Sequence, residues 1–268
     1  MLYPTISNFV NDRAQARVIA TYREELSNTD AETHAKMIAL AKSYNELLLR
    51  RDNEFSLTPQ LQQQYDALLN VTGSGIMGYV EIPCIDCVIP VYHSTEEDVL
   101  QHAAGHVEWS SLPVGGENTH CVISGHRGLP SAELLTHIDR LRIGDRFYVN
   151  VMGEMLEYQV DQIKVVLPED ARDLTIIPGG DYVTLVTCTP YGINSHRLLV
   201  RGTRLVGGRP VSGQLLLTNE VEALRLVYVL PVTLSLTVII VLCFFGIKSL
   251  LKKRPKEKKH EADNKKTS

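Results

Sequence analysis

Three side chains that could together carry out acyl transfer stand where a predicted strand meets a loop. Cys188 ends an apolar strand in TLVTCTPYGIN, and Arg197 begins the next strand after the loop 189–196. His126 ends an earlier strand in HCVISGHRG. A strand end holds a side chain rigidly, while the loop beside it leaves room for a substrate. If the three strand ends meet at one rim of a barrel, they offer a thiol nucleophile, an imidazole that exchanges protons, and a guanidinium that binds an oxyanion.

Each of these residues also has a simpler interpretation. A single cysteine is more often part of an apolar core than a nucleophile, and a lone histidine or arginine is usually solvated or hydrogen-bonded at the surface. The loop after Cys188, TPYGIN, is rich in turn residues and favours a strand end over burial within a strand. Spacing alone leaves both interpretations open.

The other cysteines and acidic residues form no convincing second site. Cys84 and Cys87 make a CxxC in EIPCIDCVIPVY, which is typical of a strand, so their odd separation should send the thiols to opposite faces. No second CxxC or HxxxH follows, so we expect neither a zinc site nor a thioredoxin-like pair here. The acidic run 96–98 lies at a predicted helix start, where the helix dipole accounts for it. Cys121 and Cys243 are interpreted as small apolar residues, and an odd total of five cysteines does not suggest a disulfide framework.

The composition indicates a globular body followed by a basic tail. Of the 268 residues, 44% are hydrophobic and 22% are charged, which excludes intrinsic disorder for most of the chain. The net charge of -4 is unevenly spread, because residues 248–268 hold nine Lys and Arg against three Asp and Glu. An acidic body argues against a nucleic-acid-binding surface.

An uncharged apolar segment near the C-terminus predicts a membrane span. Residues 226–247 carry no charge over 22 positions, which as a helix would measure about 33 Å and cross a hydrocarbon core of about 30 Å. A buried core helix is the alternative, but at this length it would normally show a polar stripe. The lysines that follow place the C-terminus in the cytoplasm and the first 225 residues outside. Because MLYPTISNFVNDRAQAR has no apolar run, we expect an export signal or anchor to precede Met1.

The apolar pattern predicts helices first and strands afterwards. Over residues 1–72 we expect two helices that pack together, the second opened by a capping box of Thr29 and Glu32, and a short third helix opened by Thr58 and Pro59. Residues 73–206 then show seven or eight short strands, with a tight hairpin at 152–155. The fold class is therefore mainly β, a closed barrel of about eight strands with an N-terminal helical appendage.

The remaining boundaries complete the expected organisation. Within the barrel we expect short helices at 95–103 and 131–138. After it come a linker at 207–225, the transmembrane helix at 226–247 and a basic cytoplasmic tail at 248–268.

Taken together, these motifs resemble those of class C sortases, the membrane-anchored cysteine transpeptidases that polymerise pilins on Gram-positive cells. The resemblance runs over residues 2–205 and includes LYPTISN, GYVEIP, GHVEWSSLPVGGENTH, SGHRGLPSAELLTHIDRL, GDRFYV and DYVTLVTCTPYGINSHRLLVRGTR. It implies the family's barrel and makes His126, Cys188 and Arg197 the catalytic residues. It also implies a Gram-positive cell-membrane protein whose catalytic domain is extracellular.

The resemblance further implies a reaction and a partner. Cys188 would attack the threonine carbonyl of an LPxTG-like sorting signal on a pilin, Arg197 would stabilise the oxyanion or hold the peptide, and His126 would protonate the departing amine. A lysine of another pilin would then resolve the thioester as an isopeptide bond. No cofactor and no nucleic acid would take part.

One segment departs from the family pattern. Sortases of this class typically cover the cleft with a lid that carries an Asp-Pro-aromatic motif, whereas this chain has Thr58 before Pro59 and Gln60 after it. No carboxylate is then placed to pair with Arg197, so we expect the cleft to be mostly open. Phe55 could replace the aromatic member of the lid, or Thr58 and Pro59 could simply begin a helix.

Two other functions stay open from sequence. A cysteine protease can also place histidine before cysteine, and it would transfer the acyl group to water rather than to an amine, although a QACxG-type signature is missing here. Outside the enzymes, the alternative is a catalytically silent membrane module that docks pilins.

Overall fold

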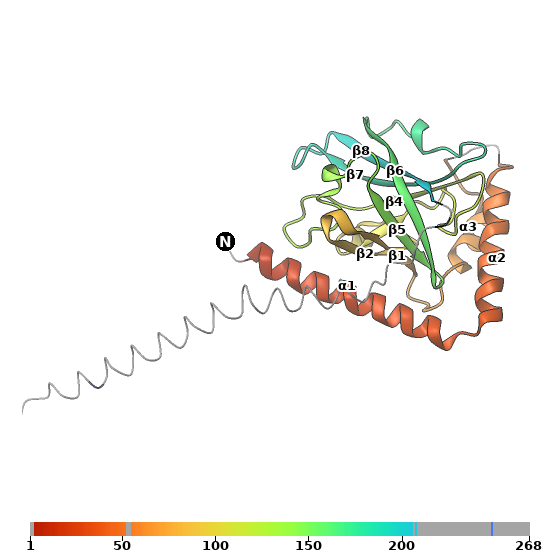
Figure 1. Ribbon diagram of the computed structural model, residues 1–268, viewed down its shortest axis with the longest axis horizontal. Helices are drawn as coiled ribbons and strands as arrows, with labels where there is room; N and C mark the ends of the chain where they lie inside the picture. Colours follow the sequence, from red (N-terminus) through yellow and green to blue (C-terminus); the bar gives the residue numbers. More distant parts are fainter. Residues whose placement is uncertain (1–2, 52–54, 206, 208–247, 249–268) are drawn as a thin grey trace, which may run out of the picture. The chain divides into compact units, whose positions relative to one another are not determined.

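The computed structural model describes residues 3–51, 55–205, 207 and 248, and every structural statement refers to these residues. Three helices precede a set of strands that closes into a barrel (Figure 1). The helices are α1 (Tyr3–Asn28), α2 (Ala31–Leu48), α3 (Pro59–Ala67) and α4 (Glu97–Leu100). The strands are β1 (Ile76–Ile82), β2 (Cys87–Tyr92), β3 (Ala104–His106), β4 (Thr119–Ser124), β5 (Arg146–Val151), β6 (Glu154–Val166), β7 (Asp181–Thr189) and β8 (His196–Arg204).

The barrel has the strand order β1-β2-β3-β4-β7-β8-β6-β5 and closes where β5 pairs with β1. Most neighbours are antiparallel, but β2 with β3 and β4 with β7 are parallel. The prediction of a mainly β, eight-stranded closed barrel with N-terminal helices is confirmed within the described chain. The three-residue strand β3 was not among the predicted segments, because it is too short to show an alternating pattern.

Alternation along the strands separates the interior of the barrel from its outer face. Val183 and Leu185 of β7 and Val200 of β8 are fully buried in the main core that fills the barrel. The residues between them point outward, and Val122, Val186 and Leu199 form a second, smaller cluster there. Side chains of Val107, Trp109, Val166 and Leu174 pack against this outer cluster.

The N-terminal helices are attached to the barrel by buried polar contacts. The Tyr22 hydroxyl of α1 donates to the Met77 carbonyl at 2.9 Å and accepts from the Met152 amide at 2.8 Å. On α2, the Asn45 side chain accepts from the Leu112 amide at 2.7 Å and donates to its carbonyl at 3.1 Å. α1 and α2 diverge from the short turn that joins them, and each lies along the barrel (Figure 1). The expected packing of the two helices on each other is therefore wrong: α1 packs on β1 and β2, and the Tyr44 ring of α2 packs against Tyr65 of α3.

The helix starts confirm one capping prediction and correct the other. Thr58 caps α3 by accepting from the Leu61 amide at 3.3 Å, with Pro59 in the first turn. The cap of α2 is Asp30 rather than Thr29, because the Asp30 carboxylate accepts from both the amide and the hydroxyl of Thr33, at 2.8 and 2.7 Å. A carboxylate with two local donors outcompetes a neighbouring hydroxyl for this position.

Turns replace regular structure at two places where the sequence was expected to continue an element. Cys84 and Cys87 do not share a strand, because β1 ends at Ile82, a 3₁₀ turn follows, and Asp86 adopts a left-handed φ of 51° before β2 begins. Residues 131–138 form no α-helix, since Leu134 has a φ of 45° and only the 3₁₀ turn Ile138–Arg140 follows. Helical structure at 95–103 is limited to the four residues of α4.

The hairpin between β5 and β6 is confirmed. Val151 pairs with Glu154, so that Met152 and Gly153, with φ of 49° and 77°, form a two-residue turn with the twist that hairpins favour. None of the helices in the described part of the chain has the length and apolar character that a membrane crossing requires. The predicted linker, membrane helix and basic tail lie outside the described residues, apart from Gly207 and Lys248.

Candidate active site

Strand pairing brings the three predicted residues to one level of the barrel wall. Cys188 on β7 pairs directly with Arg197 on the antiparallel strand β8. On the other side of β7, the parallel strand β4 pairs Ser124 with Val186, and His126 and Cys188 each follow two residues later. The Gly125 amide continues this pairing with a hydrogen bond to the Val186 carbonyl at 3.1 Å. Because neighbouring strands lie about 4.8 Å apart, the register places Cys188 and Arg197 in one row, and His126 follows two residues beyond the end of β4.

This row lies on the outer face of the barrel and not in its interior. Cys188 and Arg197 are in phase with Val186 and Leu199, which belong to the outer cluster. Val166 pairs with Arg197 from β6 and extends the row on that side. Cys188 and Arg197 are both half-buried, so the outer cluster provides an apolar floor and the row remains open to a ligand.

The His126 ring contacts a carboxylate that sequence analysis had explained by the helix dipole. Its Nε2 lies 3.2 Å from Oε2 of Glu97 on α4, and the His126 side chain is 26% exposed. Hydrogen bonds from Gln101 and then His126 hold the pKa of Glu97 below its ordinary value, so this carboxyl is ionised at neutral pH. No sequence signal pointed to this contact, since 29 residues separate the two partners.

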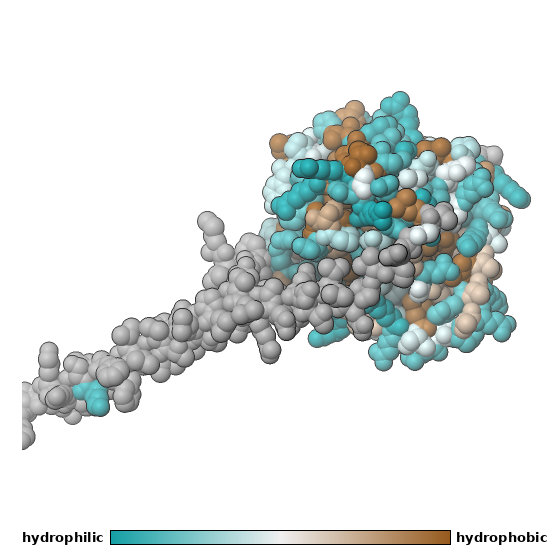
Figure 2. All heavy atoms as spheres, viewed as in Figure 1, coloured by the Kyte–Doolittle hydropathy of each residue, from teal (hydrophilic) through white to brown (hydrophobic). Residues whose placement is uncertain are grey.

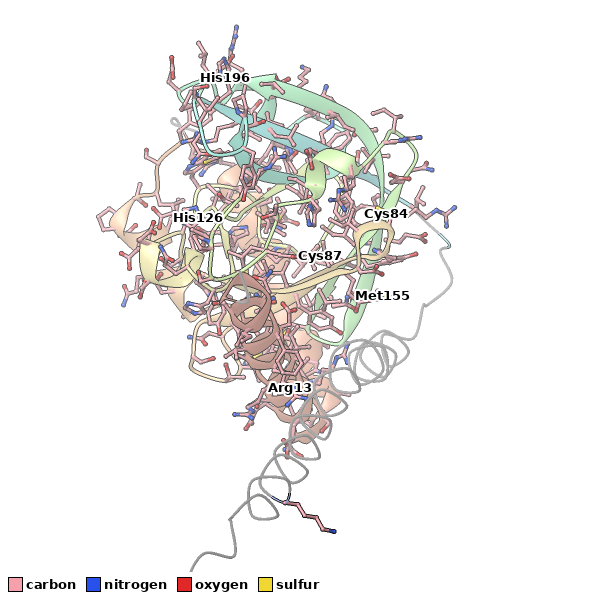
Figure 3. All side chains as sticks on the ribbon, turned by 90° about the vertical axis from the view of Figure 1, so that its left-hand side faces the viewer. Arg13, Cys84, Cys87, His126, Met155 and His196 are labelled. Carbon is pink, nitrogen blue, oxygen red and sulfur yellow. The ribbon has the colours of Figure 1, made fainter. Side chains whose placement is uncertain are left out.

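The Arg197 guanidinium turns toward the loop between β7 and β8. Its Nη1 donates to the backbone carbonyls of Asn194 at 3.3 Å and His196 at 3.2 Å. Figure 3 labels His196, the residue before Arg197, together with His126. These carbonyl contacts fix one amino group of the fork and thereby set the direction of the other donors.

A second arginine, which sequence analysis did not single out, ties this loop to the segment after β4. Arg127 follows His126 and is only 9% exposed. Its Nη1 donates to Oγ1 of Thr189 at 3.4 Å, its Nη2 donates to Asp139, and its guanidinium lies 5.9 Å from the Tyr191 ring centroid. Arg127 therefore joins the residue after Cys188 to the segment that carries His126.

Phe55, one of the candidate lid residues, lies beside the outer cluster. Its ring meets Trp109 edge to face with centroids 5.2 Å apart, and 44% of the residue is exposed. With residues 169–172 the two rings line a hollow of about 640 Å³. Asp170 in this lining is engaged by Arg172 through bonds of 2.8 and 2.6 Å, which lower the pKa of Asp170 to about 2. Thr58 and Pro59 start α3, as the alternative interpretation held, and Phe55 is the candidate that reaches the edge of the site.

The remaining cysteines lie away from this row. Cys84 lies in the 3₁₀ turn between β1 and β2, on the right in Figure 3, Cys87 begins β2, and Cys121 is buried in the main core. Cys84, Cys121 and Cys188 are free thiols. Over the described residues, no three His, Cys, Asp or Glu side chains are grouped in a way that could hold a metal ion.

Comparison with known proteins gives consistent results. The model of the sortase domain matches residues 80–205. Sortase C1 of Streptococcus agalactiae is 46% identical with a TM-score of 0.70, and the similarity covers 72% of this chain and 100% of that one. Sortase C of Streptococcus pneumoniae, described with reference to its pilin substrate specificity, is 45% identical with a TM-score of 0.65, covering 73% of this chain and 100% of that one.

A third similar structure was solved together with a sorting motif. Sortase C of Clostridium perfringens, with the C-terminal cell wall sorting motif, is 41% identical with a TM-score of 0.63, covering 71% of this chain and 99% of that one. The chain spans about half the length of the curated relatives it matches.

Proposed function

Because this chain belongs to the sortase family of cysteine transpeptidases, we propose that it cleaves an LPxTG-like sorting signal of a pilin and joins the product to a pilin lysine. The observation that carries the proposal is the register that pairs Cys188 with Arg197, with His126 two residues beyond the end of the neighbouring strand β4. A thiol, a proton carrier and an oxyanion donor are the groups that acyl transfer through a thioester requires.

The first half-reaction forms an acyl-enzyme. The Cys188 sulfur attacks the threonine carbonyl of the sorting signal, and the donors of Arg197 stabilise the negative charge that develops on the carbonyl oxygen. When the tetrahedral intermediate collapses, the C–N bond to glycine breaks and His126 gives a proton to the leaving amine. The threonine carbonyl carbon is then bonded to Cys188 as a thioester.

The second half-reaction transfers the acyl group. A lysine amine of another pilin attacks the thioester carbonyl, a C–N bond forms, and the C–S bond breaks to release the Cys188 thiolate. His126 accepts the proton that the amine loses. The product is an isopeptide bond between two pilins, and the enzyme returns to its starting state.

The partners and location follow from the relatives and the sequence. Three of the structural neighbours, whose own chains are covered to 99% or 100%, are sortases C, and one of these was solved with a C-terminal cell wall sorting motif. Sortases are enzymes of the Gram-positive cell surface. We infer the same surface for this chain, with residues 226–247 as the membrane anchor and the basic tail in the cytoplasm.

The proposal is tested with the full chain in detergent and two peptides, one with an LPxTG-type signal and one with a pilin-derived lysine. Intact-protein mass spectrometry should show an acyl adduct on Cys188 with the first peptide alone, and a joined peptide when the second is added. A protease would give the same hydrolysis product at every amine concentration, and a docking module would give no adduct. Either of these two outcomes would overturn the proposal.

A further inference from the structure

The mechanism above leaves one contact of the candidate site without a role, the approach of Glu97 to His126. His126 Nε2 and Glu97 Oε2 are 3.2 Å apart, although the residues lie on different segments. Gln101 donates to the other carboxylate oxygen, Oε1, so both oxygens of Glu97 are engaged. A carboxylate held in this way accepts a hydrogen bond from one defined nitrogen of the His126 ring.

Other parts of the molecule fix the segment that carries Glu97. The Glu96 amide donates to the Ser94 hydroxyl at 3.0 Å, and at the other end of the turn Gln15 of α1 donates to the His102 carbonyl at 2.8 Å. β2 and β3, which flank the segment, are both part of the closed barrel. Glu97 therefore stands on a turn that is anchored before and after it, which is the condition for orienting a neighbouring side chain.

We propose that Glu97 is a positioning residue for His126 in the transpeptidation reaction. Its carboxylate accepts a hydrogen bond from the Nε2–H group, fixes the tautomer that carries this proton, and leaves Nδ1 as the nitrogen that exchanges protons with the substrates. The inference rests on the proposed function, since it assigns the orientation of the group that protonates the leaving amine.

The proton balance follows from this orientation. In the first half-reaction, the imidazolium gives its Nδ1 proton to the departing glycine amine. It keeps its Nε2 proton, which stays hydrogen-bonded to Glu97. In the second, Nδ1 takes the proton that the lysine amine loses as the C–N bond forms and the C–S bond breaks. Glu97 gains and loses no proton at any step, so it acts only through His126.

The contact contributes little to folding, and its effect should therefore appear in the chemistry. The Glu97 side chain is 70% exposed, and an exposed ion pair is worth about 0–1 kcal/mol. A group that orients a general acid matters only for a substrate whose leaving group needs a proton. This dependence separates a positioning role from a structural one.

The experiment compares two acyl donors in the full chain under single-turnover conditions. One donor is a sorting peptide with its natural Thr–Gly amide, and the other is the same peptide with a thioester, whose thiolate leaves without a proton. Glu97→Gln keeps an acceptor oxygen but removes the charge, and Glu97→Ala removes both. We expect the rate of Cys188 adduct formation from the amide to fall about fivefold in the first variant and about twentyfold in the second, with less than about a twofold change for the thioester.

Two neighbouring acids provide matched controls. Glu96→Gln and Asp98→Asn each remove one negative charge from the same turn, and the His126 ring contact is made by Glu97 and not by these two residues. Both controls should leave the amide reaction within about twofold of the unmodified protein.

Three outcomes would overturn the inference: equal losses with the amide and the thioester donors, the same amide loss in Asp98→Asn, or an unchanged amide rate in Glu97→Ala. If the unmodified chain forms no Cys188 adduct from either donor, the proposed function itself fails. The thioester donor thus distinguishes the two failures, because its reaction needs the thiol but not the orientation of His126.

Discussion

Cys121 and Cys188 lie on adjacent strands of the same barrel, but their side chains lie on opposite faces. Cys121 faces the interior of the barrel and Cys188 faces outward. Cys121 on β4 pairs with Val183 on β7, and both side chains are buried in the main core. Cys188 lies five residues beyond Val183, an odd number, so it faces outward at the end of its strand. Figure 2 shows the mixed polar and apolar surface to which such outward positions belong.

The two thiols differ in what their surroundings allow. Burial, with a smaller contribution from the charge of Asp181, raises the pKa of Cys121 far above the ordinary thiol value, so this thiol stays protonated and unreactive. Cys188 is half-buried and adjoins the loop that Arg127 and Arg197 contact. The residue type is the same at both positions. Cys188 is the candidate nucleophile because its side chain faces outward and because it lies at the end of its strand.

Replacing the two thiols should give opposite results. Cys188→Ala is expected to lower acyl-adduct formation at least about 1,000-fold while changing the free energy of unfolding little, because the side chain is only half-buried. Cys121→Ala should keep the reaction and cost about 1–2 kcal/mol of stability, because it leaves a cavity in the core. Adduct mass spectrometry and urea unfolding measure the pair, and an acyl adduct on Cys121 would reverse the assignment.

A histidine inside the barrel, His106, predicts a pH dependence of stability. His106 is completely buried, accepts from or donates to Tyr65 at 2.9 Å, and has a pKa lowered to about 4, chiefly by burial. Between about pH 6.5 and 4 the unfolded chain binds a proton at His106 that the folded chain does not. Stability should therefore be fully present above pH 6.5 and fall by about 3 kcal/mol as the pH drops to 4.

Urea unfolding at pH 7 and pH 4.5 checks this prediction against His106→Gln. The variant should be less stable at pH 7 but should lose less stability on acidification. His120, whose pKa burial also lowers, adds a loss of the same sign, so the difference between the two proteins is the informative quantity. Identical pH dependence in both would show that the buried imidazole does not control acid stability.

Two outward-facing arginines on β8 sharpen the comparison within the outer face. Arg197→Lys keeps the charge but loses the fork, and it should slow adduct formation at least about tenfold. Arg201, four residues along the strand, forms a two-point ion pair with Asp161 at 3.1 and 2.8 Å and lies 4.5 Å from the Tyr182 ring centroid. Arg201→Lys should cost about 1 kcal/mol of stability and leave the rate within about twofold. Equal rate losses would mean that charge alone matters at both positions.

The smallest expected effect concerns how far Phe55 covers the outer site. Thr58 caps α3, and Phe55 contacts Trp109, so we expect Cys188 to react readily with a small thiol reagent in the resting protein. Phe55→Ala should raise the alkylation rate by less than about threefold, with Ile143→Ala, at another exposed apolar position, as a control. A Cys188 that is protected until Phe55 is removed would show that this ring closes the cleft.

The sequence by itself determined those features of the fold that depend on neighbouring residues: strands, a helix start and a tight turn. A run rich in β-branched residues predicted β7, an apolar run predicted β8, and the six-residue connection between Thr189 and His196 was enough to bring Cys188 and Arg197 into direct register. Thr58 with Pro59, and Met152 with Gly153, likewise specified a helix start and a two-residue turn, because the side chains or backbone preferences involved act within four residues.

Only the tertiary structure decided which distant segments meet. The parallel pairing of β4 with β7 places His126 beside Cys188 across a crossover of more than fifty residues, and no local signal specifies that choice. Glu97 and Arg127 acquired their contacts in the same way, since each partner lies on another segment of the chain. Periodicity reports which face of an element is apolar, whereas the closing of the barrel and the burial it provides determine which faces come together.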